Sequence, residues 1–329
     1  MTETGNSAMP RTVWVLTEGA LGMVNQCLAL TDALGLDPLI KRACPPGLWA
    51  YIPPWLALPP LTRLAQQSDS LAPPYPDLLI ACGRKSIGLA LALRRASARR
   101  CFVVYVQDPR INPARFDLVI APRHDRVRGS NVILTQGAPN RVTPARLEAA
   151  KTLFAPLFAG LARPLITVLL GGRTKHHRFD PAEAEALGRQ LAALAKQEHA
   201  GLAITASRRT PKDSLAAFRR GLGDTRAYFY DGTGENPYFG LLAHADAIVV
   251  TADSVNMISD ACSTGRPVLV AALKGRTSSR FQHFLAEMLA NGLIRWFDGR
   301  LEHYDYAPLT DAAIAAAELR RRFATFMEH

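Results

Sequence analysis

The residues best suited to chemistry gather in short polar clusters, each directly after an apolar run. The longest cluster lies within residues 251–261 (Thr-Ala-Asp-Ser-Val-Asn-Met-Ile-Ser-Asp-Ala). Ser254 can cap a helix that begins there, and the free N–H groups at that helix start attract a phosphate. Asp260 follows two turns later, where it can bind a ribose or sugar hydroxyl. A cap explains Ser254 alone, so we predict that the whole polar series binds a ligand. The other predicted ligand residues are Asp253, Asn256 and Met257 in the same run and Asn236 further upstream.

Two further clusters in the second half combine cations with small residues. Glycines beside a cation suit a diphosphate that passes close to the backbone. Hydroxyl and guanidinium groups suit phosphate oxygens. These clusters contain Gly171, Gly172 and Arg173, then Ser207 and Arg208. His176 and His177 follow the first cluster, but no carboxylate or Cys stands nearby at ligand spacing, so we expect neither a metal ion nor another cofactor.

Two carboxylates in the first half could serve as a general base. Asp108 follows a strongly apolar run, where a parallel sheet presents functional residues, and could deprotonate an acceptor hydroxyl. The other explanation of Asp108 is turn initiation by Asp-Pro. Glu18 stands in a loop with two glycines, and such a turn allows the backbone to approach a ligand closely. A turn that simply needs glycine explains that loop as well.

Other small and polar residues accompany these carboxylates at the ends of the same apolar runs. Arg84 and Lys85 are adjacent cations that could contact an anion, or they form an ordinary solvated pair. We predict that this first-half group binds the acceptor of the reaction. Its members are Gly19, Gly22, Asn25, Gln26, Arg84, Lys85, Gln107, Arg110 and Asn140.

Several familiar catalytic signatures are absent from the sequence. Neither glycine loop matches GxGxxG, so NAD is not supported, and the P-loop spacing GxxxxGK[ST] is missing. The sequence also lacks GxSxG, HExxH and CxxC. The five cysteines are dispersed and odd in number, so we expect buried free thiols rather than disulfides or a metal cluster.

Short apolar runs alternate with helical patterns along the chain, and these elements must position the clusters. Continuous apolar runs predict parallel strands that are covered on both faces. The predicted strands span residues 12–17, 77–82, 100–106, 118–121, 131–135, 165–170, 202–206, 227–230, 247–251 and 267–270. The predicted helices span residues 23–34, 87–98, 144–160, 181–197, 212–221, 237–243, 254–263, 280–291 and 311–327. Residues 45–60, with six prolines, predict a packed loop or a short irregular helix.

This alternation predicts an α/β fold with two Rossmann-like, doubly wound parallel-sheet domains. Ala-Arg-Pro at residues 162–164 precedes a new strand, so we place the boundary near residue 163. The first domain then spans residues 1–163, and the second spans residues 164–329 and ends in a C-terminal helix. Ligands of such sheets bind at the carboxyl ends of the strands, so we expect the site in a cleft between the domains.

The composition limits the classes of protein to which the chain can belong. It has 329 residues, 39 Lys+Arg, 28 Asp+Glu, a net charge of +11 and 48% hydrophobic residues, which suits two folded domains rather than a disordered or fibrous chain. No window approaches the roughly 18 apolar residues of a spanning helix, and the polar start lacks a signal pattern, so we expect a cytoplasmic protein. No basic–aromatic stripe accompanies the positive charge, so nucleic acid is not an expected partner.

The positive charge is concentrated in the first half of the sequence. Residues 1–163 hold 19 basic and 10 acidic side chains, whereas residues 164–329 hold 20 and 18. Such an excess fits an anionic lipid or glycolipid surface, where each basic residue contributes on the order of 1 kcal/mol. We therefore expect the first domain to associate peripherally with the inner face of a membrane.

Three runs of the second half resemble a known family. They are Asn-Pro-Tyr-Phe at residues 236–239, the run from Ala245 to Met257, and Thr-Gly-Arg-Pro-Val at residues 264–268. They resemble the elongated-mitochondria family, which comprises plant mitochondrial fission factors and bacterial relatives. The resemblance runs through most of the chain and includes Gly22, Asn25-Gln26, Gln107-Asp108-Pro109 and Gly171-Gly172.

That family is in turn similar to glycosyltransferase-B enzymes, in which two Rossmann-like domains face each other. The resemblance implies a nucleoside-diphosphate sugar on the second domain and a cell-envelope or lipid-linked acceptor on the first, joined without a metal ion. It also implies an alternative, a non-catalytic scaffold, because the plant relatives have a recruiting role. Asp260 stands where many such transferases have a Glu that binds the donor ribose. The first loop lacks the His that is often present there, which leaves Asp108 and Glu18 as the candidate bases.

Overall fold

The chain folds into two compact units, each built around one sheet. The computed structural model describes residues 9–53, 56, 58–173, 179–275 and 278–328. Unit 1 comprises Met1–Arg141 and Thr310–His329, and unit 2 comprises Val142–Leu309. Each unit contains a six-stranded sheet in which every pairing is parallel.

The sheet of unit 1 has the strand order β2-β1-β3-β4-β5-β6. Its strands are β1 (Val13–Thr17), β2 (Leu39–Arg42), β3 (Leu78–Cys82), β4 (Phe102–Val106), β5 (Leu118–Pro122) and β6 (Val132–Thr135). Its helices are α1 (Leu21–Leu34), α2 (Ser86–Ala96), α9 (Asp311–Met327) and the short 3₁₀ turns η1 (Gly47–Ala50), η2 (Pro113–Arg115) and η3 (Arg123–Asp125).

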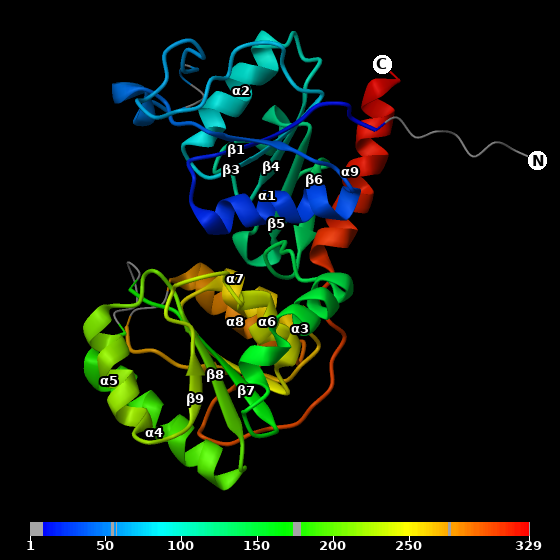
Figure 1. The fold of residues 1–329 in the computed structure, drawn as a ribbon. Helices are drawn as coiled ribbons and strands as arrows, with labels where there is room; N and C mark the ends of the chain where they lie inside the picture. The colour runs from blue at the N-terminus through cyan, green and yellow to red at the C-terminus, as the bar shows by residue number, and fades with distance from the viewer. Residues whose placement is uncertain (1–8, 54–55, 57, 174–178, 276–277, 329) are drawn as a thin grey trace, which may run out of the picture. The chain divides into compact units, whose positions relative to one another are not determined.

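Helices cover both faces of this sheet, because its central strands are apolar on both sides. β1, β3, β4 and β5 are buried along their whole length. One core cluster joins these strands to α2, and a second joins their opposite face to α1 and α9. Figure 1 shows α9, the red helix, beside α1, although nearly 300 residues separate them in the sequence.

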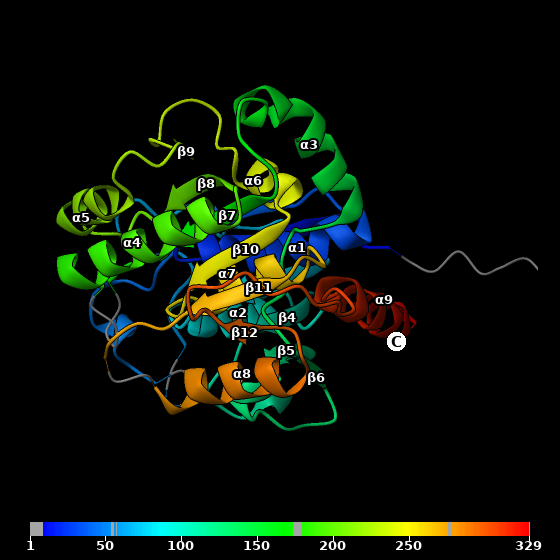
Figure 2. The ribbon, with the colours of Figure 1, turned by 90° about the horizontal axis from the view of Figure 1, so that it is seen from below.

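The sheet of unit 2 has the strand order β12-β11-β10-β7-β8-β9. Its strands are β7 (Leu165–Leu170), β8 (Gly201–Ala206), β9 (Ala227–Phe229), β10 (Ala247–Thr251), β11 (Val268–Ala271) and β12 (Arg295–Trp296). Its helices are α3 (Pro144–Phe158), α4 (Pro181–Gln197), α5 (Lys212–Leu222), α6 (Tyr238–His244), α7 (Val255–Cys262) and α8 (Ser279–Ala290). Figure 2 shows these strands in order from β9 to β12, with α4 and α5 on one face. The helices α6, α7 and α8 pack on the other face.

Both sheets have a point at which the strand order reverses, and we call it the switch point. In unit 1 the first strand, β1, pairs with β2 on one side and with β3 on the other. In unit 2 the first strand, β7, pairs with β8 on one side and with β10 on the other. The loops that leave the two central strands of a switch point diverge, so the carboxyl ends there are the usual ligand site of open α/β sheets.

The observed elements confirm the predicted fold class, and each predicted strand and helix is present within a few residues. The structure adds β2 and β12, which the apolar pattern did not predict because both are short and lie at sheet edges. Residues 45–60 contain the 3₁₀ turn η1, as predicted. All five cysteines are free, and all but Cys44 are buried.

The structural units differ from the division predicted near residue 163. α3 belongs to unit 2, because Phe154 and Phe158 pack with Leu165 and Leu241 in one cluster. α9 belongs to unit 1, where Asp311 accepts hydrogen bonds from the N–H groups at residues 136 and 137. Counted over these units, the charge is less uneven: unit 1 holds 19 basic and 12 acidic residues, and unit 2 holds 20 and 16.

Candidate functional site

A buried carboxylate occupies the switch point of unit 2. Asp253 follows β10, and its side chain is 0% exposed. Its Oδ2 accepts a hydrogen bond from the N–H of Gly172 at 3.0 Å, and its Oδ1 accepts one from the Thr251 hydroxyl at 2.7 Å. Thr251 Oγ1 in turn accepts from the N–H of Gly171 at 2.7 Å. The loops after β7 and β10 are therefore tied together by a closed set of hydrogen bonds.

The same contacts explain why residues 171 and 172 are glycines. A Cβ on Gly171 would lie 1.7 Å from Asp253 Oδ1, and a Cβ on Gly172 would lie 2.2 Å from the backbone of Arg209. The sequence suggested that these glycines offer their N–H groups to a diphosphate. The structure instead uses both N–H groups within the protein, so the glycines contribute close packing at this edge.

The described parts of the loops after β7 and β8 carry three arginines, one of which contacts this packed centre. Arg209 in the loop after β8 places Nη2 3.4 Å from Asp253 Oδ2, and its side chain is 48% exposed. Its carbonyl accepts a hydrogen bond from the N–H of Arg173 at 3.0 Å, which joins the loops after β7 and β8. Arg173 and Arg208 are exposed in the same two loops. Three guanidinium groups therefore belong to the loops around one switch point, a suitable charge for phosphate oxygens.

The start of α7 forms the third part of this site. Ser254 is the N-cap residue, and its hydroxyl accepts a hydrogen bond from the N–H of Met257 at 3.4 Å, as predicted for a cap. Further along α7, Asp260 Oδ2 accepts a hydrogen bond from the Tyr238 hydroxyl at 2.8 Å. Burial raises the pKa of Asp260 to about 7, and the Tyr238 hydrogen bond limits that rise. Asn236 begins the same region, where its Oδ1 accepts from the N–H of Tyr238 at 3.1 Å.

At the switch point of unit 1 the polar groups are more exposed. Lys85 Nζ lies 3.3 Å from Glu18 Oε2, and the two side chains are 51% and 22% exposed. This contact joins the loops after β1 and β3, and it raises the pKa of Lys85. Gly19 and Gly83 both have a positive φ, of 93° and 99°, which explains the glycines at these two turns.

The turn after β4 has an unusual backbone. Gln107 has a φ of 88°, a left-handed value that is rare for a residue with a side chain. Its Nε2 donates to Gln26 Oε1 at 3.1 Å, which connects the turn to α1. Asp108 Oδ1 accepts from the N–H of Arg110 at 2.7 Å, while the N–H of Asp108 contacts Asp125 Oδ2 at 3.3 Å. Such strained turns persist where surrounding contacts fix them, and they are frequent at functional sites.

The structure thus brings most of the predicted residues to the carboxyl edges of the two sheets. Gly22 lies in the first turn of α1, and Asn25 is exposed one turn further. Asn140 is buried, and its Nδ2 donates to the carbonyl of Ala138 at 3.3 Å, so it supports its own loop. His176 and His177 lie outside the described residues.

Two residues that the sequence did not single out take part in these arrangements, His124 and Asp125. Arg209, Thr210 and Tyr238 also take part, and they lie in the same polar runs as the predicted residues Ser207, Arg208 and Asn236. Thr210 donates from its hydroxyl to the carbonyl of Gly171 at 2.5 Å. The signal that could have identified this group is its position, because every member lies in a turn after a strand or next to a predicted site residue.

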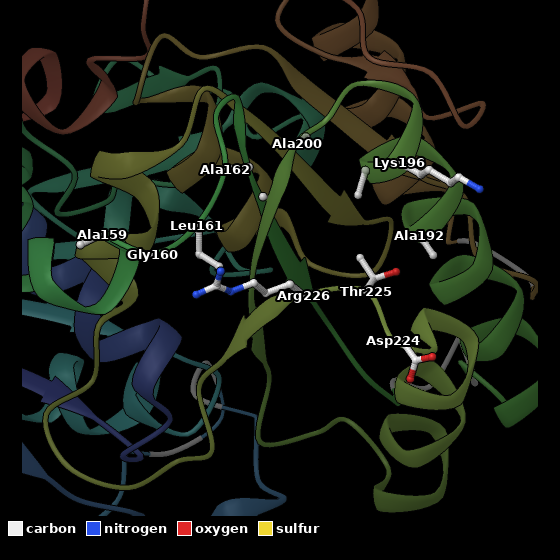
Figure 3. A pocket seen from close by; sticks show the side chains of 12 residues that line it. Ala159, Gly160, Leu161, Ala162, Ala192, Lys196, Ala200, Asp224, Thr225 and Arg226 are labelled. Carbon is white, nitrogen blue, oxygen red and sulfur yellow. The ribbon is translucent and has the colours of Figure 1, made fainter.

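A shallow cavity elsewhere in unit 2 is separate from these residues. It has a volume of about 680 Å³ and lies near the amino ends of β7, β8 and β9 (Figure 3). Lys196, Asp224 and Arg226 are its charged lining residues. The predicted ligand residues follow the carboxyl ends of the strands, so this cavity is at the opposite edge of the sheet.

Among the residues that the structure describes, no helix is long and apolar enough to cross a membrane. Within the same part of the chain, no three His, Cys, Asp or Glu side chains gather as potential ligands of one metal ion.

Comparison with solved structures supports the fold. UDP-GlcNAc 2-epimerase from Methanocaldococcus jannaschii is similar with a TM-score of 0.53 at 13% identity, covering 93% of this chain and 91% of that chain. The same enzyme in complex with UDP-GlcNAc and UDP gives a TM-score of 0.52 at 12% identity, covering 94% and 98%. The epimerase from Neisseria meningitidis bound to UDP-GlcNAc gives 0.51 at 14% identity, covering 96% and 93%. The fold is therefore of the glycosyltransferase-B type, which these epimerases share.

Comparison of sequences identifies the family. The mitochondrial fission protein ELM1 of Arabidopsis thaliana is 35% identical over 276 residues, which cover 76% of this chain and 64% of that protein. The chain thus spans somewhat less than two thirds of the Arabidopsis protein. The uncharacterized protein RP120 of Rickettsia prowazekii is 24% identical over 346 residues, covering 91% of this chain and 95% of that protein. The sequence profile of the family described as Mitochondrial fission ELM1 matches residues 21–323, and the chain belongs to that family.

Proposed function

We propose that the chain is a glycosyltransferase that binds a nucleoside-diphosphate sugar at the switch point of unit 2. The loops after β7, β8 and β10 lie at one edge of the sheet; the first two carry arginines, and the third leads into α7. This convergence is the observation that carries the proposal. The guanidinium groups of Arg173, Arg208 and Arg209 are the expected ligands of the diphosphate. The start of α7 adds N–H groups and the positive end of a helix dipole. Two of the similar structures are complexes with UDP-GlcNAc, which suggests the same class of ligand.

The details of this site refine what each residue contributes. The N–H groups of Gly171 and Gly172 already donate to Thr251 and Asp253. The diphosphate therefore contacts the arginine side chains and the start of α7 rather than these N–H groups. Asp260, with its Tyr238 partner, is placed to accept a hydrogen bond from a ribose hydroxyl. Guanidinium groups and a helix start can stabilise a leaving diphosphate, which is the role of a metal ion in other transferases. The proposed reaction is therefore metal-independent.

In the proposed reaction, unit 1 binds the acceptor, a cell-envelope or lipid-linked molecule with a free hydroxyl. The hydroxyl oxygen forms a bond to the anomeric carbon of the sugar as the bond from that carbon to the diphosphate breaks. Asp108 takes the hydroxyl proton, and Glu18 is the second candidate base. Asp108 suits this role because its N–H donates to Asp125 Oδ2 and its Oδ1 accepts from the N–H of Arg110, which together fix the turn. The diphosphate leaves with its charge stabilised in unit 2.

A thermal-shift experiment tests the donor site. Nucleoside diphosphates (UDP, GDP, ADP and CDP) should raise the melting temperature of the full chain, because a ligand that binds only the folded state stabilises it. Ser254→Ala combined with Arg173→Ala should abolish the shift. Arg84→Ala combined with Lys85→Ala in unit 1 should retain it and serves as the matched control. If no nucleoside diphosphate raises the melting temperature, the donor site is wrong.

One observation favours a second candidate, a scaffold that kept the fold and lost the chemistry. The switch point of unit 2 is filled by a protein carboxylate whose hydrogen bonds are internal, as expected of a packed structural centre. The Arabidopsis relative is named as a mitochondrial fission protein. A scaffold would show no hydrolysis or transfer of any nucleotide sugar and would retain stable protein complexes in a pull-down. An enzyme would show turnover that Asp108→Asn reduces at least about a hundredfold.

A further inference from the structure

A cavity that the proposed function does not use lies near the amino ends of β7, β8 and β9, and we call it the amino-end cavity (Figure 3). Its volume of about 680 Å³ lies within the range of roughly 300–1,000 Å³ that is usual for small-molecule sites. Its lining comes from residues 159–162 after α3, from residues between 192 and 201 at the end of α4 and the start of β8, and from residues 224–226 before β9. All of these belong to unit 2, at the sheet edge opposite its switch point.

Small side chains leave this space open. Seven of the twelve lining residues are alanine or glycine. α4 contributes Ala192, Ala195 and Lys196, whose spacing of three and four residues places them on one face of the helix. A Cβ on Gly201 would lie 2.6 Å from the carbonyl oxygen of Ala162, so a glycine is required where the segment after α3 approaches β8. The alanine methyl groups give the cavity an apolar wall.

Charged side chains from two of these segments stand beside the apolar wall. Lys196 of α4, and Asp224 and Arg226 before β9, line the cavity and are exposed. A Cβ on Gly160 would lie 2.9 Å from Nη2 of Arg226, so the guanidinium group lies against the backbone that follows α3. Figure 3 shows the Arg226 side chain extended toward Leu161 and Gly160. The close backbone contact therefore gives this guanidinium group a defined place in the cavity.

The two cations of the cavity, Lys196 and Arg226, have no carboxylate partner in the part of the chain that the structure describes. Other arginines of unit 2 each contact a carboxylate, namely Arg163, Arg189, Arg209, Arg220 and Arg295. An arginine in a defined position without such a partner is suited to bind an anion that a ligand supplies. Asp224 offsets one of the two positive charges, which favours a ligand with a single negative charge over a diphosphate.

We propose that the amino-end cavity binds a small organic anion that combines an apolar body with one singly charged acidic group. The apolar body lies on the alanine methyl groups and leaves water there. The acidic group accepts hydrogen bonds from the Arg226 guanidinium group, and the Lys196 ammonium group adds a second positive charge. This site is separate from the proposed donor site and does not depend on the proposed function.

Fluorescence titration of the full chain with two matched probes tests this proposal. Anilinonaphthalene sulfonate carries one negative charge, and its emission rises when its rings leave water. N-phenylnaphthylamine has the same rings without the sulfonate group. We expect the wild type to bind the anionic probe at one site per chain and at least about tenfold more tightly than the neutral probe. Methanesulfonate has the charge without the rings and should not displace the anionic probe at equal concentration.

Three variants locate the binding site. Lys196→Gln/Arg226→Gln removes both cations and should bind the anionic probe at least about tenfold more weakly, with little change for the neutral probe. Ala162→Phe fills the cavity and should weaken the binding of both probes. The matched control is Arg189→Gln/Arg220→Gln, which removes arginines of α4 and α5 that are 61% and 63% exposed. The control should bind both probes like the wild type.

Several results would overturn the proposal. They are absence of binding of the anionic probe by the wild type, equal affinity for the two probes, and a loss in the control as large as that in Lys196→Gln/Arg226→Gln. Unchanged binding by Lys196→Gln/Arg226→Gln would also overturn it, because the probe would then lie elsewhere. The melting temperature of each variant checks its folding, and if Ala162→Phe does not fold, the glutamine variant decides alone. Binding of the anionic probe at this site without any shift by UDP would support this proposal and remove the donor site.

Discussion

The two switch points share one topology, but the central polar side chain is buried in unit 2 and the polar side chains are partly exposed in unit 1. In unit 2 the space between the diverging loops is filled by Asp253, a carboxylate with no exposed side-chain surface. In unit 1 the corresponding loops are bridged by Glu18 and Lys85, an ion pair whose lysine is 51% exposed. The comparison shows that the fold places polar residues at both edges, while burial decides whether they act as framework or remain accessible.

The difference has a physical basis in the hydrogen bonds. A buried carboxylate is tolerated only when its oxygens are fully used, and Asp253 satisfies this through Thr251, Gly172 and Arg209. Such a network holds the loops in one arrangement, which suits a rigid platform for an anion. An exposed ion pair contributes little to stability and rearranges readily, so this edge is less constrained than the edge of unit 2.

The largest effect should come from adding a single methyl group at the switch point of unit 2. Gly171→Ala would place Cβ 1.7 Å from Asp253 Oδ1, so we expect a loss of about 3–5 kcal/mol in the free energy of unfolding. In unit 1, Gly19→Ala meets its nearest atom, Arg42 Cδ, at 3.6 Å and should cost only the left-handed backbone strain, about 1–2 kcal/mol. Urea unfolding of both variants measures the difference. Equal losses would show that the two edges are packed alike.

A somewhat smaller effect should follow from removal of the buried carboxylate. Asp253→Ala leaves the N–H of Gly172 and the hydroxyl of Thr251 without their acceptor, so we expect a loss of about 3 kcal/mol. Asp253→Asn is the conservative control and should lose less, because its amide oxygen still accepts one of these bonds. A loss below about 1 kcal/mol for Asp253→Ala would contradict the role of this network.

A moderate, pH-dependent effect is expected at Asp260. Its pKa of about 7 in the folded chain lies above the value of 3.8 that is usual for an aspartate, so the folded state binds the proton more tightly than the unfolded state. The protonated carboxyl therefore favours folding below about pH 4, and this contribution is lost as the pH rises to about 7. Asp260→Asn cannot titrate, so its melting temperature relative to the wild type should increase between pH 4 and pH 8. A constant difference across this range would show that Asp260 is not perturbed.

The smallest effect is expected for the ion pair of unit 1. Glu18→Gln and Lys85→Ala should each change the free energy of unfolding by about 0–1 kcal/mol, because the pair is partly exposed. The change should shrink further in high salt, which screens exposed charges. A loss comparable to that of Asp253→Ala would mean that both switch points are structural centres.

The sequence predicted the central strands accurately because each is a continuous apolar run. It did not predict β2, whose residues are mostly exposed and which lies at the sheet edge beside β1, or β12, which has two residues. The assignment of α3 and α9 to the units also escaped prediction. Their helical pattern is evident in the sequence, but the sheet against which Phe154 or Phe323 packs is a tertiary property.

The candidate site was predictable in position but not in orientation. The pattern of polar clusters after strands located the edges that carry Gly171, Asp253 and Glu18. It did not show that the Asp253 carboxylate points inward and uses the glycine N–H groups, because this depends on contacts between loops about 80 residues apart. Likewise, Arg208 and Arg209 are adjacent in the sequence, and only the structure shows which of them contacts Asp253.

Calorimetric titration of the full chain with UDP tests the central claim most directly. The wild type should bind UDP with one site per chain, Arg173→Ala/Arg208→Ala should lose at least about tenfold in affinity, and Arg84→Ala/Lys85→Ala should bind like the wild type. UDP is the first choice because it is present in a similar structure, and GDP, ADP and CDP complete the series. Equal affinity of the two double variants, or no binding of any nucleoside diphosphate, would contradict the assignment of the donor site to unit 2.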